Sequence, residues 1–240
     1  MLSEPRTLES GCRRDTSATA ARPAASQSLA ATEGTTVRKL AILEPILIYA
    51  MILAYIWRLR YSHSGAWIAI LALMLLSHLA RREAPYSLGF RTRNMRECWR
   101  RFAPPLAFLA LLMLASGTLL HTIRPIAVAT AMASWAAYVP WGVFQQYALN
   151  GYFLNRFRAV MGLRAASLVA AALFCGAHAP NWLLMVVAFP AGYCSTLIYR
   201  RYRNLYFLGL AHATVGFLLF LVVPDSVSHH LKVGPGWFGH

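Results

Sequence analysis

Five polar side chains interrupt long apolar stretches in the second half of the chain. Gln145, Gln146 and Asn150 fall in one stretch, His178 closes the next, and His212 lies in the last. An imidazole takes up and releases a proton near neutral pH, whereas a carboxamide exchanges hydrogen bonds but cannot act as a base. Because polar groups are costly in such surroundings, these five residues are the candidates for a functional site.

The stretches that carry these residues are typical of a membrane protein. Of the 240 residues, 58% are hydrophobic and 13% are charged, and the mean hydropathy is +0.47. About 20 apolar residues in a helix cross a bilayer. The apolar blocks run over 40–57, 65–80, 102–123, 125–153, 161–178, 182–199 and 205–223. They predict an all-α fold, a polytopic transmembrane helical bundle of about seven spans, with the fourth span tilted or broken near Pro140.

Changes in composition divide the chain. Residues 1–36 are rich in Ser, Thr, Ala and Arg and have no apolar run, so we expect a disordered N-terminal tail. This tail lacks the apolar segment of a cleaved signal peptide, so the first span should act as the targeting signal. Residues 37–85 should form two N-terminal transmembrane helices and the first loop, residues 86–223 the main transmembrane core, and residues 224–240 a C-terminal tail.

The net charge of +15 indicates a membrane face rather than a nucleic acid partner, because no basic stretch has a nucleic-acid-binding motif. If every block crosses the bilayer and the N-terminus is cytoplasmic, 15 of the Lys and Arg residues that lie beside the spans are on the cytoplasmic side and 4 are on the other. The lipid bilayer is therefore the expected environment. The excess of Arg over Lys and the abundance of Ala are typical of high-GC bacteria, which favours the bacterial inner (cytoplasmic) membrane.

The three polar motifs are predicted to share one depth in the membrane. At about 1.5 Å per helical residue, Gln145 lies roughly 16 Å from the arginine loop that follows it, His178 about 21 Å from Arg164, and His212 about 13 Å from Arg203. All three therefore reach the middle layer of the bilayer.

These residues also carry a family resemblance. The chain resembles the CAAX prenyl protease and bacteriocin-processing (CPBP, or Abi) family of intramembrane proteases. Its Phe174-x-x-x-His178 motif, extended by Ala179-Pro180-Asn181, and the run around His212 match two family motifs in order and spacing. Leu88-Gly89-Phe90-Arg91 resembles the lead-in to the family core, and the similarity covers roughly residues 86–220.

The resemblance implies an intramembrane endopeptidase that acts on a membrane-associated peptide or protein. The implied catalytic residues are His178, His212, Gln145 and Gln146, and the implied substrate-binding residues are Asn150, Phe174 and Asn181. No cofactor is expected, although the two histidines could alternatively share a metal ion.

The departures from the family pattern leave a second function open. The family has Glu-Glu-x-x-x-Arg where this chain has Gln145, Gln146 and Asn150, and asparagine where it has Gly216. Positions 146 and 150 are one helical turn apart, so Gln146 and Asn150 should form a neutral hydrogen-bonded pair. A motif that keeps its shape without its charges also fits a catalytically inactive relative that binds a membrane peptide or partner protein.

Other residues offer weaker candidates. Glu44 is the one acid inside an apolar block, and Cys175 precedes His178 by three residues. The simpler interpretations are an interfacial acid and a small packing residue. The four cysteines have no paired spacing and are expected to be free thiols. A solute carrier is disfavoured because no inverted repeat is evident.

Overall fold

The computed structural model describes residues 41–239, and this part of the chain is helical with no strand. The predicted all-α class is therefore confirmed. The predicted tail, residues 1–36, lies outside the described residues. Four helices are long and apolar enough to cross a membrane: Ala41–Ser62, α4 (Met95–Leu119), α8 (Trp182–Tyr202) and α9 (Leu205–Val222).

The remaining predicted spans also form helices, but the count of seven spans is not confirmed. Helices α3 (Ala66–Ala80) and α7 (Leu163–Gly176) are apolar and shorter than a full span. Helix α5 (Val128–Gln146) contains Pro140 and continues past it, so the helix is not broken there.

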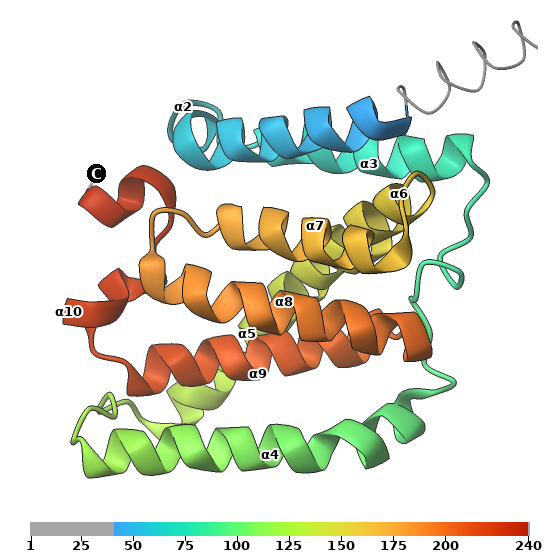
Figure 1. The fold of residues 1–240 in the computed structure, drawn as a ribbon. Coiled ribbons are helices and arrows are strands. Elements are labelled where there is room, and N and C mark those ends of the chain that lie inside the picture. The colour runs from blue at the N-terminus through green and yellow to red at the C-terminus, as the bar shows by residue number, and fades with distance from the viewer. Residues whose placement is uncertain (1–40, 240) are drawn as a thin grey trace, which may run out of the picture. The chain divides into compact units, whose positions relative to one another are not determined.

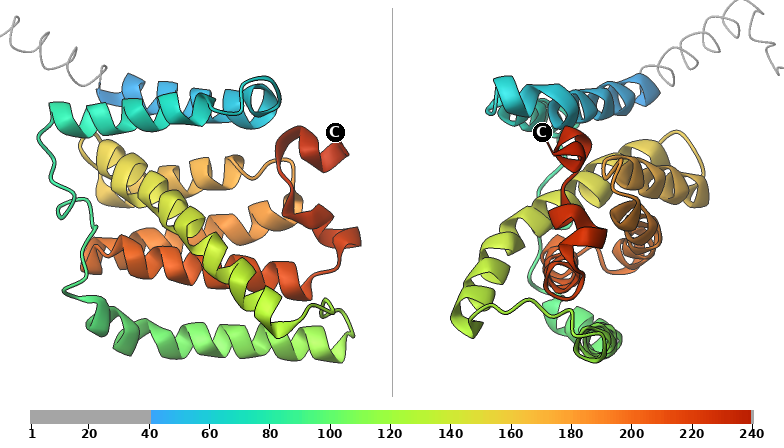
Figure 2. Two further views of the ribbon diagram at one scale, coloured as in Figure 1. Left: turned by 180° about the vertical axis from the view of Figure 1, so that it is seen from behind. Right: turned by 90° about the vertical axis from the view of Figure 1, so that its left-hand side faces the viewer.

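The irregularity of the fourth block lies further along the chain. Helix α5 passes directly into the π-helix η2 (Tyr147–Leu154), which is followed by the short α6 (Asn155–Arg158). Figures 1 and 2 show that this long helical segment runs diagonally across its neighbours. A π-helical turn rotates the side chains that follow it and is often found at functional sites.

Figure 1 shows which helices of residues 41–239 are neighbours. Helix Ala41–Ser62, which includes η1 (Tyr55–Leu59) and α2 (Arg60–Ser62), lies beside α3. Helix α7 packs against α8, and α9 packs against both α5 and α4. The short elements α10 (Asp225–Ser228), η3 (His229–Leu231) and η4 (Gly234–Phe238) follow α9.

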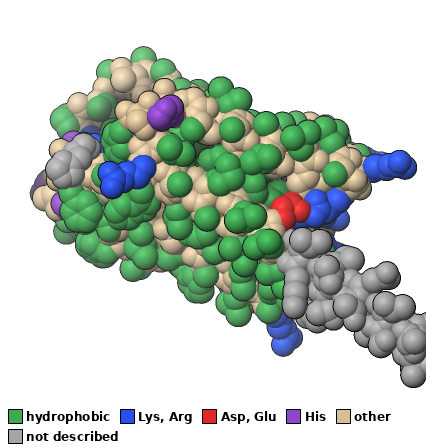
Figure 3. Space-filling view, turned by 90° about the horizontal axis from the view of Figure 1, so that it is seen from above, with side chains coloured by type: hydrophobic (Ala, Val, Ile, Leu, Met, Phe, Trp, Pro, Cys, Tyr) green, Lys and Arg blue, Asp and Glu red, His purple; other side chains and the backbone are tan. Residues whose placement is uncertain are grey.

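Apolar side chains both fill the interior and cover the outside. The core is centred on η2, where Leu149, Tyr152 and Leu154 are almost fully buried. Many large apolar side chains point outward, for example Phe108 and Leu111 of α4. Figure 3 shows such side chains covering much of the face seen there. This surface is suited to lipid contact.

A polar cluster attaches the N-terminal helices to the core. Arg156, at the end of the fourth block, donates to both carboxylate oxygens of Glu83, at 3.1 and 2.8 Å. Its Nε also lies 3.4 Å from Glu44. Glu44 in turn accepts hydrogen bonds from Ser77 and Arg81. These side chains join helix Ala41–Ser62, α3 and its following loop, and α6.

Candidate active site

Two glycines bring α5 and α9 into backbone contact. A Cβ added to Gly142 would lie 2.5 Å from the carbonyl oxygen of Gly209, and one added to Gly209 would lie 2.4 Å from Val143 Cγ2. Only glycine fits such an approach, and small residues play this role between membrane helices. The contact places the Gln145-Gln146 turn of α5 beside the stretch of α9 that carries His212.

Gln146 and Asn150 form the predicted pair within a larger buried network. Asn150 Nδ2 donates to Gln146 Oε1 at 2.8 Å. The same nitrogen lies 2.8 Å from Ser195 Oγ, whose hydroxyl donates to Gln146 Oε1 at 2.5 Å. All three side chains are buried, and Asn150 is 0% exposed. The network joins α5, η2 and α8 without a formal charge.

The two histidines meet around one aromatic ring. The ring of Phe174 lies 4.8 Å from that of His178 and 5.8 Å from that of His212, edge to face in both cases. His178 and His212 are also close enough to interact electrostatically. Phe174 therefore holds side chains from the α7–α8 turn and from α9 in a single half-buried cluster.

The hydrogen bonding of His178 fixes which nitrogen can react. His178 Nδ1 lies 2.7 Å from the carbonyl oxygen of Phe174, which can only accept. Nδ1 therefore carries the hydrogen, and in the neutral ring Nε2 carries the lone pair. This arrangement orients Nε2 as a proton acceptor.

Gln145 joins the histidine cluster through Tyr138. The Tyr138 hydroxyl and the Gln145 side chain are close enough to interact, and the Tyr138 ring lies 6.3 Å from that of His212. A Cβ at Gly216 would lie 2.9 Å from Tyr138 Cε1. Gly216 thus makes room for Tyr138 at the position where the family pattern has asparagine.

The predicted site residues therefore occupy three environments. Gln145, Phe174, His178 and His212 belong to one half-buried cluster with Tyr138, and we name these five residues the histidine cluster. Gln146 and Asn150 lie in the adjacent buried network with Ser195. Asn181 lies apart from both groups, in the turn between α7 and α8.

Asn181 supports the turn that carries His178. Its Oδ1 accepts from Leu184 N at 3.1 Å and so caps α8. Its Nδ2 donates to the carbonyl oxygens of Ser228 and Lys232 at 2.9 and 3.1 Å. The side chain is 0% exposed. These bonds tie the α7–α8 turn to the C-terminal segment.

Sequence reasoning missed Ser195 and Tyr138. Ser195 is a polar residue inside an apolar span, which is the same signal that identified Gln145 and His212. Tyr138 precedes Gln145 by seven residues, which is two helical turns and therefore the same face of α5. Both signals can be read in the sequence, but the residues that Ser195 and Tyr138 contact on other helices cannot.

The alternative residues have partners outside the histidine cluster. Glu44 pairs with Arg81 and also accepts a hydrogen bond from Tyr152 at 2.9 Å. Cys175 Sγ lies 3.4 Å from the carbonyl oxygen of Met185. Within residues 41–239, no three His, Cys, Asp or Glu side chains are grouped to hold a metal ion. A metal bound by His178 and His212 would need further ligands from elsewhere.

Comparison with known proteins adds one finding. Residues 127–218 match the family model described as type II CAAX prenyl endopeptidase, Rce1-like. No curated protein and no solved structure matched the chain. The matched range contains the histidine cluster and the Gln146–Asn150–Ser195 network. It confirms the CAAX protease family resemblance, whereas the Leu88–Arg91 lead-in lies outside it.

Proposed function

We propose that this membrane-embedded relative of the Rce1-like CAAX endopeptidases is itself an intramembrane endopeptidase that cleaves a membrane-associated peptide or protein. The observation that supports the proposal best is the packing of His178 and His212 against the single ring of Phe174. One imidazole from the α7–α8 turn and one from α9 would then face one reaction centre, as hydrolysis by paired groups requires.

In the proposed reaction, His178 is the general base. Its Nε2 takes a proton from water, and the resulting hydroxide attacks the scissile carbonyl carbon. The tetrahedral intermediate collapses when the C–N bond breaks and His178 returns the proton to the leaving amine. The products are a carboxylate and an amine, and no cofactor takes part. A positioned acid or base contributes about 10² to 10⁴ in rate.

The other cluster residues would orient the reacting groups. His212 would donate a hydrogen bond to the developing oxyanion, which is a large source of rate enhancement in peptide hydrolysis. Gln145, held by Tyr138, would orient the attacking water. Gln146 and Asn150 would support this arrangement from the buried network. Of the three predicted substrate-binding residues, Phe174 would contact the substrate, whereas Asn150 and Asn181 are fully buried and would position the site.

The charge asymmetry supports an orientation, and the composition supports a source. We propose that the N-terminus lies in the cytoplasm, because this orientation places the arginine-rich loops inside. We propose the bacterial inner membrane because of the excess of Arg over Lys and the abundance of Ala.

A second function is favoured by the Gln146–Asn150–Ser195 network. The hydrogen bonds of this network join neutral groups, so Gln146 and Asn150 are held together without the charges of the family motif. In the described part of the chain, Asn150 Oδ1 is buried without a hydrogen-bond partner. A catalytically inactive relative that binds a membrane peptide in the same place would show this feature.

Purified protein and a panel of membrane peptides separate the two functions. We expect cleavage by the wild type and by His121→Ala, in which an exposed histidine distant in sequence from the motifs is removed. His178→Ala and His212→Ala should each lose at least about 100-fold in rate. Equal cleavage by all forms would exclude the histidine mechanism.

Further variants address the inactive alternative and the cofactor. Activity that appears only in the triple variant Gln145→Glu, Gln146→Glu, Asn150→Arg would identify the natural chain as a binding protein. A chelator should leave the wild-type rate unchanged, and loss of cleavage on chelation would instead indicate a metal at the histidines.

A further inference from the structure

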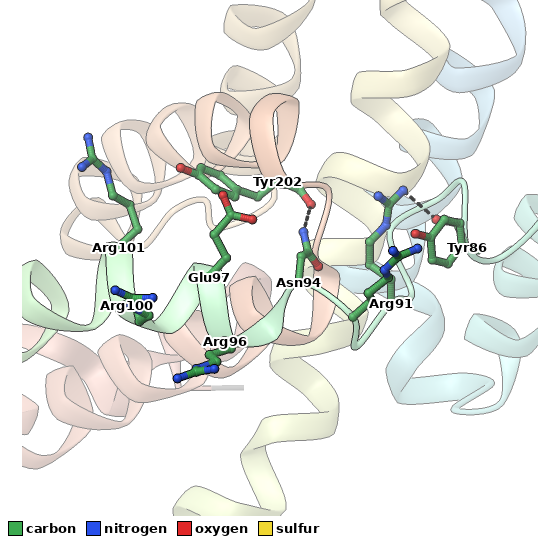
Figure 4. A pocket seen from close by; sticks show the side chains of 9 residues that line it. Tyr86, Arg91, Asn94, Arg96, Glu97, Arg100, Arg101 and Tyr202 are labelled. Carbon is green, nitrogen blue, oxygen red and sulfur yellow. Dashed lines mark hydrogen bonds between the residues drawn. The ribbon is translucent and has the colours of Figure 1, made fainter.

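An arginine-rich groove of about 740 Å³ lies where α4 begins and α8 ends (Figure 4). Glu97 is the one acid among its lining residues. Five of its lining residues are arginines, and we name this pocket the arginine groove: Arg91, Arg93, Arg96, Arg100 and Arg101. The excess of positive charge indicates an anionic occupant.

A rigid frame holds the groove. The side chain of Asn94 donates to the carbonyl oxygen of Tyr202, and its Oδ1 accepts from Asn204 Nδ2 at 2.8 Å. Gly89 has a φ of +100°, and a Cβ there would lie 2.9 Å from the carbonyl oxygen of Arg203. The loop before α4 is therefore docked closely on the α8–α9 turn, and the arginines project from fixed backbone.

The charge of the groove is not neutralised by the protein. In the described part of the chain, Arg93, Arg96 and Arg100 are exposed, and no ion pair includes them. Arg91 is held against Tyr86, with its guanidinium carbon 4.3 Å from the ring centroid. Neighbouring cations repel one another, so an anion bound between them is favoured.

The groove lies at the ends of two helices that could cross the bilayer, where lipid headgroups would be expected. Helices α4 and α8 are both long enough to cross the bilayer, and the groove is formed at Met95 and Tyr202, where they begin and end. Beyond the groove, α4 exposes apolar side chains such as Phe108 and Leu111, at 69% and 66%. Basic residues thus adjoin an apolar helix surface, which a soluble anion would not require.

We propose that the arginine groove binds the phosphate headgroup of an anionic phospholipid, with the acyl chains along the exposed surface of α4. The planar guanidinium forks pair with phosphate oxygens. Basic pockets at the ends of membrane helices are typical sites for such lipids. The site is separate from the histidine cluster and needs no catalytic activity.

Equilibrium binding of a fluorescent phosphatidylglycerol to the purified full chain in neutral detergent tests the proposal. Unlabelled phosphatidylglycerol should displace the probe, whereas phosphatidylcholine and inorganic phosphate at the same concentration should not. Arg96→Gln with Arg100→Gln should weaken binding about 30-fold, since each arginine at a membrane surface contributes about fivefold.

The matched control removes the same charge from the same predicted membrane face. Arg158→Gln with Arg164→Gln changes two exposed arginines outside the groove and should leave the affinity within about twofold. Arg93→Gln with Arg101→Gln repeats the test with a second groove pair, in case the first variant fails to fold. Equal losses in groove and control variants, or displacement by inorganic phosphate, would overturn the proposal.

Discussion

At the residue scale, amides occupy the positions where the family pattern has charges, and the Ser195 hydroxyl bonds to two of them. One-turn spacing was enough to predict the Gln146–Asn150 pair, which the structure contains. Ser195 was not predicted, because it comes from α8 and its approach depends on how two helices cross. Spacing along one helix is visible in a sequence, whereas the partner across an interface is not.

Ser195→Ala should destabilise the protein by about 1–2 kcal/mol. The change leaves Gln146 with one donor fewer and Asn150 with one acceptor fewer in a buried setting. Ser116→Ala is the control, because Ser116 is exposed and bonds only within its own helix, to Leu112 at 2.8 Å. Unfolding midpoints in detergent would measure both variants, and equal shifts would show that the network contributes no stability.

At the element scale, the apolar blocks predicted where helices form but not how long they run. The blocks at 65–80 and 161–178 give helices of 15 and 14 residues, because hydropathy reports an apolar stretch and not the turns that end it. Similarly, the π-helix after Gln146 has no signal in the composition. In a π-helix the backbone hydrogen bonds join residues five apart instead of four, and the packing of the surrounding helices selects between these two patterns.

Gly209→Ala should separate α5 from α9. The added methyl would meet Val143 Cγ2 at 2.4 Å and Val143 Cα at 2.5 Å, and the second contact is to backbone that cannot rotate away. We expect a loss of about 1–3 kcal/mol in unfolding free energy.

Gly162→Ala provides the control for this prediction. A Cβ at Gly162 has nothing within 4 Å, and its φ of −59° suits any residue. Unfolding in detergent should distinguish the two variants, and an unchanged Gly209→Ala protein would contradict the close α5–α9 contact.

At the scale of the whole molecule, a cluster of charges joins the N-terminal helices to the core. Burial by itself raises the pKa of Glu83, but hydrogen bonds from Arg156 and His78 outweigh it and hold the pKa below the ordinary 4.5. The count of Lys and Arg beside the predicted spans placed Arg156 in a loop on the cytoplasmic side. It could not show that Arg156 turns inward, where its side chain is 5% exposed.

The lowered pKa makes stability depend on pH in a defined direction. The carboxylate is favoured in the folded state, so its contribution is fully present above the ordinary pKa and is lost as pH falls through the folded-state pKa. Glu83→Gln should therefore be less stable than wild type at about pH 7, with the difference shrinking toward about pH 3. Denaturant unfolding at several pH values would measure this, and a difference independent of pH would contradict the ion pair.

The central claim is that His178 and His212 act as one unit on a membrane peptide. It is tested most directly by the rates of peptide cleavage in heavy-oxygen water for the wild type, His178→Ala, His212→Ala and the double variant. The proposal predicts a labelled carboxylate at the new C-terminus and a double variant about as slow as the slower single variant, because groups in one mechanism are not additive. Multiplying losses, or cleavage that persists when both histidines are gone, would contradict it.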